Sequence, residues 1–223
     1  MESLGGPAER IRPTPAAHFD LADVTAPVAA AIVVAGAAGL PRTPGLPDDA
    51  FVHDGQITKR PMRALTLSAL APRPGEILWD IGAGSGSISV EWCLAGGRAF
   101  AIEARADRAE NIRANAAAFG VTNCLTVVEQ HAPAALEKLS PPNAVFVGGG
   151  GEQPLFDALW AMIPEGTRLV ANAVTLETEA LLLAEQNRHG GELMRIELSQ
   201  ATPLGKMRSW VSSRPVVQWS VVR

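Results

Sequence analysis

From residue 60 onward, short apolar segments alternate with amphipathic ones, and this alternation constrains the fold more than any other feature. Short apolar segments bounded by turn residues predict strands, and apolar residues at helical spacing predict helices. The predicted strands are 76–81, 99–103, 125–128, 144–147, 168–172, 192–197 and 216–222. The predicted helices are 61–70, 87–94, 107–119, 133–139, 154–162 and 176–188.

Five strand–helix units followed by two strands without an intervening helix predict an α/β fold. Parallel neighbours need crossover helices, so we expect a mostly parallel sheet with helices on both faces. The final pair of strands has no crossover helix, which predicts that one of them is antiparallel. The expected architecture is a seven-stranded, mostly parallel sheet with one antiparallel strand.

Proline marks a domain boundary near residue 47. Seven of the 17 prolines fall in the first 50 residues, and PRTPGLP at 41–47 is typical of a linker because each proline fixes φ and removes a donor. Residues 28–35 are apolar enough to form one buried strand, but a lone strand is not a domain. We therefore expect residues 1–46 to be the remnant of a preceding domain with its linker, and 47–223 to be the main domain.

Composition excludes several classes of protein. The chain has 19 Lys and Arg against 23 Asp and Glu, a net charge of −4 that disfavours a protein acting mainly through nucleic-acid phosphates. Cys93 and Cys124 are too few for a disulfide framework, and the four histidines form no metal motif. The longest apolar run, 28–40, is shorter than the roughly 18 residues of a membrane span. We expect a cytoplasmic protein with no metal, nucleic-acid or membrane partner.

The segment LWDIGAGSGS at 78–87 carries the most informative motif, because an apolar strand runs into a glycine-rich turn that opens a helix. Glycines there let the backbone turn tightly and approach a ligand, at the end of the sheet where nucleotide-like cofactors bind. Asp80 precedes the turn, and Glu103 ends the next strand, where a carboxylate can accept hydrogen bonds from ribose hydroxyls. The turn glycines are Gly82, Gly84 and Gly86.

Two classes of cofactor use this layout. Dinucleotide sites usually have GxGxxG spacing, with the pyrophosphate at the helix N-terminus. Here the spacing is GxGxG with Asp80 at its head, and a carboxylate would repel a pyrophosphate but attract the ammonium of a methionine group. The motif therefore favours S-adenosylmethionine. A dinucleotide site, or glycines that serve only a tight turn, are the alternatives.

Six segments together make the chain resemble the class I S-adenosylmethionine-dependent methyltransferases and, more narrowly, the decarboxylating precorrin-6B carbon-15 methyltransferases of cobalamin biosynthesis. They are GLPDDAFVHDGQITKR (45–60), DIGAGSGSISVEW (80–92), AIEARADR (101–108), HAPAAL (131–136), VFVGGGGE (145–152) and ANAVTLET (171–178). The resemblance covers about residues 46–223. It implies the Rossmann-like class I methyltransferase fold. It also implies methylation of a precorrin at carbon 15 with decarboxylation of the carbon-12 acetate, precorrin-6B to precorrin-7.

The first 46 residues resemble the end of a different enzyme, the tetrapyrrole carbon-5 methyltransferase that precedes this domain in bifunctional versions. LGGPAERIR at 4–12 and the apolar segment 28–35 carry this similarity. The resemblance implies that the chain is normally fused to an N-terminal carbon-5 methyltransferase domain. It also implies a homotetramer, and Trp210 and Trp219 are candidates for burial against a neighbouring subunit.

Carried onto this sequence, the resemblance implies a set of cofactor contacts. Thr58 reaches the cofactor from the segment before the first helix, Glu103 holds the ribose, and the backbone of Ala132 contacts the adenine. His131 stands where relatives often have Asp, and a neutral histidine accepts a hydrogen bond from the adenine amino group only through its unprotonated nitrogen. The methionine part is wrapped by the turn residues Gly82, Ala83, Gly84, Ser85 and Gly86, with Asp80 before them.

Basic residues gather in two places on this net acidic chain, which indicates a polyanionic ligand. One group is Lys59, Arg60 and Arg63; the other follows Glu197, after which no acidic residue occurs, and comprises Lys206, Arg208, Arg214 and Arg223. A tetrapyrrole with carboxylate arms fits, and we expect Lys59, Arg60 and Arg208 to clamp it, while the glycine loop 148–151 lets the flat ring approach the methyl group.

Two other classes of function stay open at this stage. A class I methyltransferase acting on RNA or protein is the main alternative, although the chain has no tyrosine for base stacking. A noncatalytic S-adenosylmethionine-binding subunit is the second. For a precorrin substrate the conjugated macrocycle supplies the electrons, so no catalytic acid–base set or metal is expected.

Overall fold

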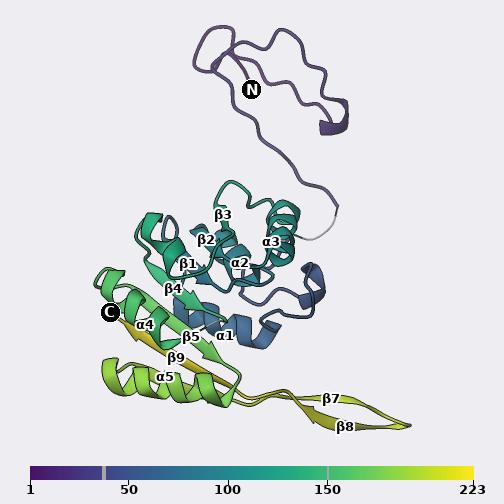
Figure 1. Ribbon diagram of the computed structural model, residues 1–223. Coiled ribbons are helices and arrows are strands. Elements are labelled where there is room, and N and C mark those ends of the chain that lie inside the picture. The colour runs from purple at the N-terminus through teal and green to yellow at the C-terminus, as the bar shows by residue number, and fades with distance from the viewer. Residues whose placement is uncertain (37–38, 150) are drawn as a thin grey trace. The chain divides into compact units, whose positions relative to one another are not determined.

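The computed structural model describes residues 1–36, 39–149 and 151–223, and the chain divides into two compact units, Met1–Leu40 and Pro41–Arg223. The second unit is built on a seven-stranded sheet (Figure 1). Its strands are β1 (Ile77–Ile81), β2 (Arg98–Ile102), β3 (Leu125–Val128), β4 (Ala144–Val147), β5 (Arg168–Ala173), β6 (Glu192–Ile196) and β9 (Val216–Val222). They lie in the order β3-β2-β1-β4-β5-β9-β6.

The pairing of the strands confirms the predicted sheet. Neighbours from β3 to β5 are parallel, whereas β9 pairs antiparallel with both β5 and β6. β9 is therefore the antiparallel strand of this sheet. It lies between β5 and β6. The chain runs from β6 to β9 without a crossover helix, so the two strands pair antiparallel, as we predicted for the last two strands.

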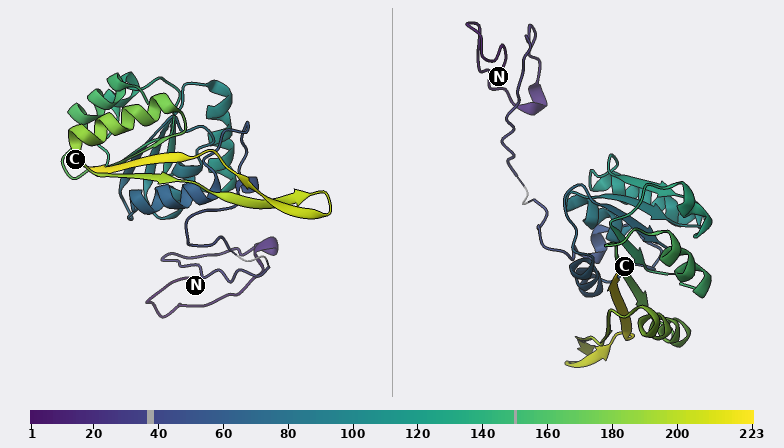
Figure 2. Two further views of the ribbon diagram at one scale, coloured as in Figure 1. Left: turned by 90° about the horizontal axis from the view of Figure 1, so that it is seen from below. Right: turned by 90° about the vertical axis from the view of Figure 1, so that its left-hand side faces the viewer.

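α-Helices cover the sheet on both faces, as predicted. They are α1 (Arg60–Leu70), α2 (Ser87–Leu94), α3 (Ala106–Ala118), α4 (Gln153–Met162) and α5 (Leu176–His189). Buried side chains of α1, α2 and α3 join one apolar cluster, and those of α4 and α5 join a second cluster on the opposite face (Figure 2). Trp79 and Trp92 are core residues.

The predicted helix at 133–139 is instead a single 3-10 turn, η3 (Ala134–Lys138). Proline lies before it and two prolines follow at 141–142, so the segment is too short to build successive α-helical turns. Only Ala135 and Leu136 of this turn are buried, and both belong to the second apolar cluster.

A second structure that the sequence did not predict is an antiparallel hairpin of β7 (Ser199–Leu204) and β8 (Met207–Ser212). The hairpin extends from the sheet between β6 and β9 (Figure 1), and Trp210 is 73% exposed on it. Trp219, in contrast, is fully buried in the unit's own core and donates its indole N–H to the carbonyl of Gly190 at 2.9 Å. The expectation that Trp219 packs against a neighbouring subunit is therefore wrong.

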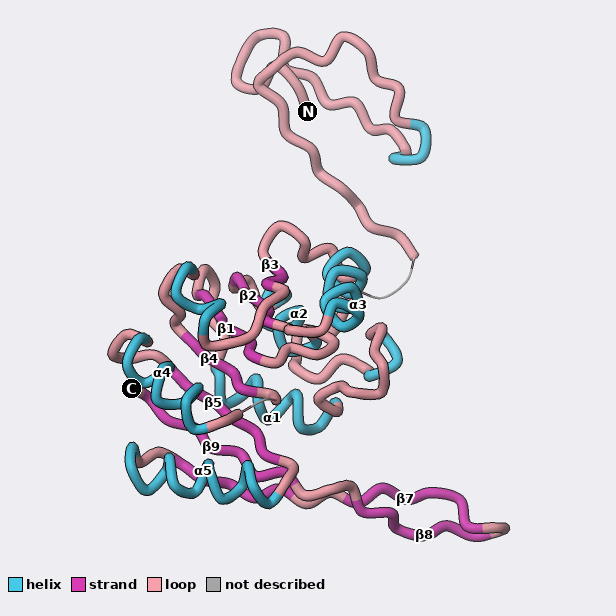
Figure 3. Tube along the Cα trace, in the orientation of Figure 1, coloured by secondary structure: helices cyan, strands magenta, loops and turns pink. Residues whose placement is uncertain are grey.

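The first unit contains little regular structure in its described residues (Figure 3). It has one 3-10 turn, Ala16–His18, and an isolated bridge between Glu2 and Arg10. The predicted buried strand at 28–35 is wrong, because these residues form no strand and Val33 is 94% exposed. An apolar run alone does not make a strand when no partner strand is present to pair its backbone. Ala37 and Ala38, within the predicted remnant 1–46, lie outside the described residues.

The centre of the first unit is the carboxylate of Glu2, which receives hydrogen bonds from Arg10 and Arg12. Burial opposes ionisation of Glu2, but the hydrogen bonds from Arg12 and Arg10 outweigh it and hold the pKa of this carboxyl below its ordinary value. The second unit already includes Gly45 and Leu46, and Leu46 belongs to its apolar core. None of the helices in the described parts of the chain has both the length and the apolar character needed to cross a membrane.

Candidate cofactor and substrate site

A cavity of about 940 Å³ opens at the carboxyl ends of the central strands. One wall is the glycine-rich turn between β1 and α2, and the facing wall is the segment that precedes α1, including Thr58. Beyond the turn, the cavity passes Gly148 and Gly149 after β4 and reaches Asn172 on β5. The base of the β7–β8 hairpin closes the far side with Gln200, Thr202 and Arg214 among its lining residues.

The glycine-rich turn fits tightly against its neighbours. Gly82 and Gly86 have φ of 68° and 71°, in the left-handed region that glycine adopts without strain. A Cβ on Gly82 would lie 2.6 Å from the carbonyl oxygen of Gly149, and a Cβ on Gly86 would lie 2.7 Å from the side chain of Ile112 on α3. These glycines are thus required by packing, and they bring the turn directly against the loop after β4.

Glu103 follows β2 and supports the turn from the adjacent strand. Its carboxylate is buried and accepts hydrogen bonds from the backbone N–H of Gly84 at 3.0 Å and of Arg105 at 2.9 Å. A carboxylate oxygen can accept more than one hydrogen bond, so both oxygens retain capacity for a ligand. The predicted proximity of Glu103 to the turn is realised, although Glu103 does not itself line the cavity.

Asp80 lies beneath the turn, fully enclosed by protein. One carboxylate oxygen accepts hydrogen bonds from the backbone N–H of Ser89 at 3.2 Å and from its hydroxyl at 2.6 Å. The other oxygen has no hydrogen-bond partner among the described residues, and the same holds for the hydroxyl of Ser85. Burial, with a smaller contribution from the negative charge of Glu103, raises the pKa of Asp80 to about 6 against the opposing effect of Ser89.

These features test whether the turn suits the predicted cofactor. S-adenosylmethionine carries ribose hydroxyls and an ammonium group, and the site offers a carboxylate with free acceptor capacity beside the turn and a second carboxylate below it. Two buried polar atoms at the turn, on Asp80 and Ser85, lack partners in the described structure, and Ser85 lines the cavity, where a polar ligand or its water can remove that cost. The residues present fit the group.

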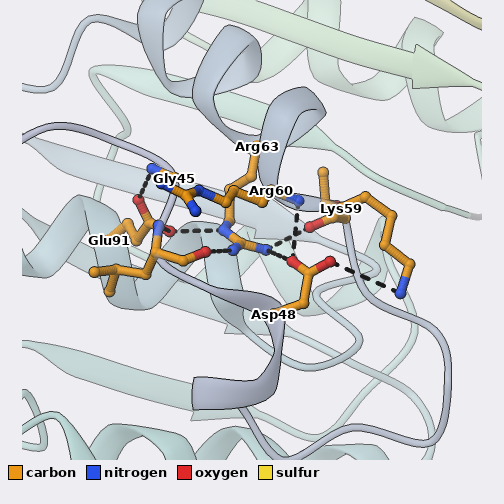
Figure 4. Close-up of polar contacts among 8 residues, drawn as sticks. Gly45, Asp48, Lys59, Arg60, Arg63 and Glu91 are labelled. Carbon is orange, nitrogen blue, oxygen red and sulfur yellow. Dashed lines mark hydrogen bonds and ion pairs between the residues drawn. The ribbon is translucent and has the colours of Figure 1, made fainter. Parts of the chain in front are cut away.

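Arg63 organises the segment that forms the facing wall (Figure 4). Its guanidinium is completely buried and donates to the carboxylate of Glu91 on α2 at 2.6 Å and to that of Asp48 at 3.1 Å. It also donates to the carbonyl oxygens of Leu46 and Thr58, and it lies 4.8 Å from the centre of the Phe51 ring. The expectation that Arg63 joins a cationic group at the cavity mouth is therefore wrong, because all of its charge is used inside the protein.

The carboxylates that pair with Arg63 hold the same segment at further points. Glu91 accepts the backbone N–H groups of Gly45 at 2.7 Å and Leu46 at 3.0 Å. Asp48 accepts the backbone N–H of Arg60 at 2.9 Å and lies 3.9 Å from the ammonium of Lys59. This network leaves the side chains of Lys59 and Arg60 exposed at the cavity mouth, where both line the wall.

The remaining predicted site residues divide between the cavity and its surroundings. Thr58, Lys59, Arg60 and the turn from Gly82 to Ser85 line the cavity. Asp80, Gly86, Glu103, His131, Ala132 and Arg208 do not. His131 is exposed in the loop after β3, and Ala132 packs on the second apolar cluster. Gly148 and Gly149 of the predicted glycine loop line the cavity, whereas Gly150 lies outside the described residues.

Sequence reasoning did not single out several lining residues. Arg214, which the sequence placed in the second basic group but not among the proposed clamp residues, lines the cavity at the base of the hairpin, whereas the proposed clamp residue Arg208 lies exposed on β8 opposite Pro203. Gln200 and Thr202 also reach the cavity through the unpredicted hairpin. Among the described residues, no group of three or more His, Cys, Asp or Glu side chains is arranged to hold a metal ion.

Comparison with known proteins places this geometry in a family context. Residues 49–223 match the family model described as "Precorrin methyltransferase domain". The crystal structure of the C-terminal domain of precorrin-6Y C5,15-methyltransferase from Rhodobacter capsulatus is 61% identical, with a TM-score of 0.81 over 82% of this chain and 100% of that chain. Its similarity extends to fold and sequence together.

Two relatives show how the chain corresponds to whole proteins. A precorrin-6Y C(5,15)-methyltransferase [decarboxylating] from Sinorhizobium sp is 52% identical over 226 residues, which are 99% of this chain and 54% of that protein. A probable cobalt-precorrin-6B C(15)-methyltransferase (decarboxylating) from Saccharolobus solfataricus is 35% identical over 179 residues, 76% of this chain and 88% of that protein. The chain thus spans about half the length of the first relative and most of the second. It belongs to the precorrin methyltransferase domain family.

Proposed function

We propose that the chain is a cytoplasmic, S-adenosylmethionine-dependent C-methyltransferase of cobalamin biosynthesis. It methylates carbon 15 of a precorrin and removes the carboxyl group of the carbon-12 acetate, converting precorrin-6B to precorrin-7. The observation that carries the proposal is a cavity of about 940 Å³ that joins the glycine-rich turn to the basic side chains of Lys59, Arg60 and Arg214, which line it together with Arg108. A cavity of this size accommodates a large ring next to a cofactor.

The relatives support assigning the carbon-15 reaction to this chain. The Sinorhizobium protein is named for reactions at carbons 5 and 15, and this chain covers 54% of it. The Saccharolobus protein is named for carbon 15 and decarboxylation alone, and this chain matches 88% of its length. Both relatives are named for the reaction at carbon 15, and this chain matches a portion of each. We therefore assign the carbon-15 reaction to that portion.

When bound, S-adenosylmethionine supplies an electrophilic methyl group attached to a positively charged sulfur. Gly82, Ala83, Gly84 and Ser85 form the wall that would face it, and Thr58 faces them from the segment held by Arg63. Glu103 would accept hydrogen bonds from the ribose hydroxyls, while the carboxylate of Asp80 below the turn favours a nearby positive charge. His131 and Ala132 remain the proposed adenine contacts.

The protein's part in the chemistry is to position the ring and exclude water. Lys59, Arg60 and Arg214 would hold carboxylate arms, and the side chains of Phe146, Val174 and Val216 form an apolar surface for the ring. An electron pair of the conjugated macrocycle forms the new bond to the methyl carbon as its bond to sulfur breaks. In the decarboxylation, the bond between the acetate CH₂ and its carboxyl carbon breaks, carbon dioxide leaves, and the electron pair enters the macrocycle, whose positive charge after methyl transfer it neutralises; a proton that moves from the macrocycle to the CH₂ then completes the methyl group. Orientation is the main catalytic contribution in such a reaction.

We also propose that the chain acts as part of a larger assembly, a homotetramer fused to an N-terminal carbon-5 methyltransferase domain. Trp210, Met207 and Leu204 of the hairpin are 66–76% exposed, and an isolated two-stranded hairpin with such a surface gains stability from a covering partner. Light scattering of the purified protein tests the tetramer, and Trp210→Ser should lower its mass if the hairpin contributes.

Mass spectrometry of the protein incubated with S-adenosylmethionine and precorrin-6B tests the activity. We expect the product to gain one methyl group and to lose carbon dioxide. Glu103→Ala should reduce turnover and cofactor affinity together, whereas Glu177→Ala, at an exposed position in the first turn of α5, should change neither. Cofactor binding by calorimetry with no change in the mass of the precorrin would contradict the proposal.

A further inference from the structure

Asn172 occupies an unusual position for a polar side chain. It lies near the end of β5, directly opposite Gln218 on β9 in the antiparallel register, and it lines the cavity. Both side chains point to the face of the sheet covered by α1, where Thr66 meets them. Val170, two residues earlier on the same face, is part of the apolar core. A polar residue has therefore replaced the apolar pattern of this strand where the strand reaches the cavity.

Asn172 is held by a closed set of hydrogen bonds. The amide nitrogen of Gln218 donates to the carbonyl oxygen of Asn172 at 2.9 Å and to the hydroxyl of Thr66 at 3.1 Å. The amide nitrogen of Asn172 in turn donates to Thr66 at 2.9 Å. An amide nitrogen carries two hydrogens, so Gln218 uses both and Asn172 uses one. The network fixes the orientation of the Asn172 amide and leaves one N–H on the residue that borders the cavity.

The network carries a cost that packing alone does not explain. Thr66 and Gln218 are fully buried, and the carbonyl oxygen of Gln218 has no hydrogen-bond partner among the described residues. A buried unsatisfied acceptor destabilises the fold, and apolar side chains at these positions would avoid that cost. Sites that depart from the otherwise consistent pattern of a fold are often functional. Of the three residues in the network, Asn172 is the one that lines the cavity, so a ligand can form a hydrogen bond with it.

The surroundings of Asn172 define the ligand chemistry. Phe146, Val174 and Val216 line the same cavity and offer no side-chain donor. In apolar surroundings a free N–H binds an anionic acceptor more strongly than in water. We propose that Asn172 is a specificity-determining residue that donates a hydrogen bond to a carboxylate arm of the tetrapyrrole, and that Gln218 is its positioning residue. This inference rests on the proposed function and deepens it.

The first test compares Asn172→Ala and Asn172→Asp, with Asn187→Asp at an exposed position of α5 as the matched control. Titration of precorrin-6B monitored by its absorbance gives the substrate Kd without turnover, and steady-state kinetics gives KM. We expect Asn172→Ala to weaken substrate binding about tenfold, the usual loss for one hydrogen bond to a charged group. Asn172→Asp should weaken it further because its carboxylate repels the arm. The Kd for S-adenosylmethionine and the circular dichroism spectrum should stay unchanged in all three.

The result for Asn172→Asp shows whether the side chain of Asn172 acts as a hydrogen-bond donor or as an acceptor. If Asn172→Asp binds precorrin-6B as well as the unaltered protein does, or if Asn172→Ala has no effect on Kd and KM, the inference is wrong while the proposed function stands. If the unaltered protein binds S-adenosylmethionine but neither binds nor converts precorrin-6B, the proposed function fails and the inference fails with it.

A second test addresses Gln218. Gln218→Leu should raise KM for the precorrin without changing kcat or cofactor affinity, because it frees the Asn172 side chain to adopt other orientations. In the Asn172→Ala background the same change should have no further effect on KM, since residues that act through one interaction are not additive. Equal effects of Gln218→Leu in both backgrounds would contradict the positioning role.

Discussion

Residues 1–40 and residues 41–223 each place a buried glutamate against arginine, but they differ in what surrounds the ion pair. The carboxylate of Glu2 pairs with Arg10 and Arg12 in a unit in which most of the large apolar side chains are exposed, including Ile32 and Val33. Glu91 receives Arg63 beside an apolar cluster that includes Leu46 and Phe51. The ion pair in residues 41–223 is therefore accompanied by an apolar core. The ion pairs in residues 1–40 have no comparable core beside them.

Apolar burial, more than the ion pair, accounts for the stability of the second unit. The attraction within a buried ion pair offsets the cost of removing its charges from water only when the geometry is good and further hydrogen bonds are made. The pair also adds little apolar burial. The first unit thus has local order without the principal driving force of folding. Its apolar segment 28–35 is exposed, so this unit gains little from apolar burial. The second unit combines both contributions, and its ion pair supports the wall of a site.

The largest expected effect comes from breaking the ion pair of the second unit. Arg63→Met leaves Glu91 buried without its cation and removes the donor to Asp48, so we expect a loss of about 3–5 kcal/mol in the free energy of unfolding. Urea denaturation followed by circular dichroism measures it. Arg73→Met, which removes an exposed arginine near Glu76, is the control and should cost less than about 1 kcal/mol. Equal losses would show that burial does not distinguish the two pairs.

Asp80 in the second unit and Glu2 in the first should make stability depend on pH in opposite directions. Its folded-state pKa of about 6 lies above the ordinary value of 3.8, so the ionised form destabilises the ligand-free protein above pH 6. Asp80→Asn removes that cost, up to about 3 kcal/mol, and the gain should shrink as pH falls from 6 to 4. Thermal unfolding at several pH values measures this. Glu2 has the opposite sign, because its lowered pKa adds stability that is lost as pH falls.

A pH-independent gain for Asp80→Asn would contradict the raised pKa. The same variant should weaken binding of S-adenosylmethionine, since the negative charge below the turn is lost. Greater stability together with weaker cofactor binding is the pattern expected when a buried charge is retained for function.

The fold of the second unit was largely predictable because its signals are local. Each buried strand is a short apolar run, and the helices between them determine that neighbours are parallel. The hairpin escaped prediction because most of its residues are exposed on both sides and Pro203 and Gly205 interrupt the strand pattern. A strand was wrongly predicted at 28–35 because its composition suits a strand, whereas strand formation also depends on partner strands from elsewhere in the protein.

The site was predictable where its residues share a continuous motif or follow adjacent predicted strands. Gly82 and Glu103 could be brought together because adjacent parallel strands end at the same edge of a sheet. The burial of Arg63 depends on Glu91, 28 residues away, and on the carbonyl oxygen of Leu46, 17 residues away. Asn172 depends on Gln218, 46 residues away. Such contacts arise from tertiary packing, and no spacing rule in the sequence indicates them.

Removal of residues 1–40 should have a small effect on the rest of the chain. Both apolar clusters draw only on residues from Leu46 onward, so the shortened chain keeps its complete core. We expect the free energy of unfolding of the main transition to change by less than about 1 kcal/mol and cofactor affinity to be unchanged. Extending the deletion through Leu46 removes one buried side chain and two backbone N–H groups that donate to Glu91, and this longer deletion should be clearly destabilising. Similar stability of the two truncated proteins would show that the hydrogen bonds to Glu91 contribute little.

The smallest effect is expected at Glu2. Glu2→Gln removes the charge that holds Arg10 and Arg12, so the first unit should become more accessible to protease while the main unfolding transition stays where it was. Limited proteolysis with mass mapping of the fragments measures the rate of cleavage within residues 1–40, and Asp20→Asn, at an exposed position of the same unit, serves as the control. Low pH should have the same effect on the unaltered protein, because protonation of Glu2 below its lowered pKa breaks the same contacts. A shift of the main transition in Glu2→Gln would instead mean that the two units are energetically coupled, and the contrast between a unit with a core and one without would no longer explain their stabilities.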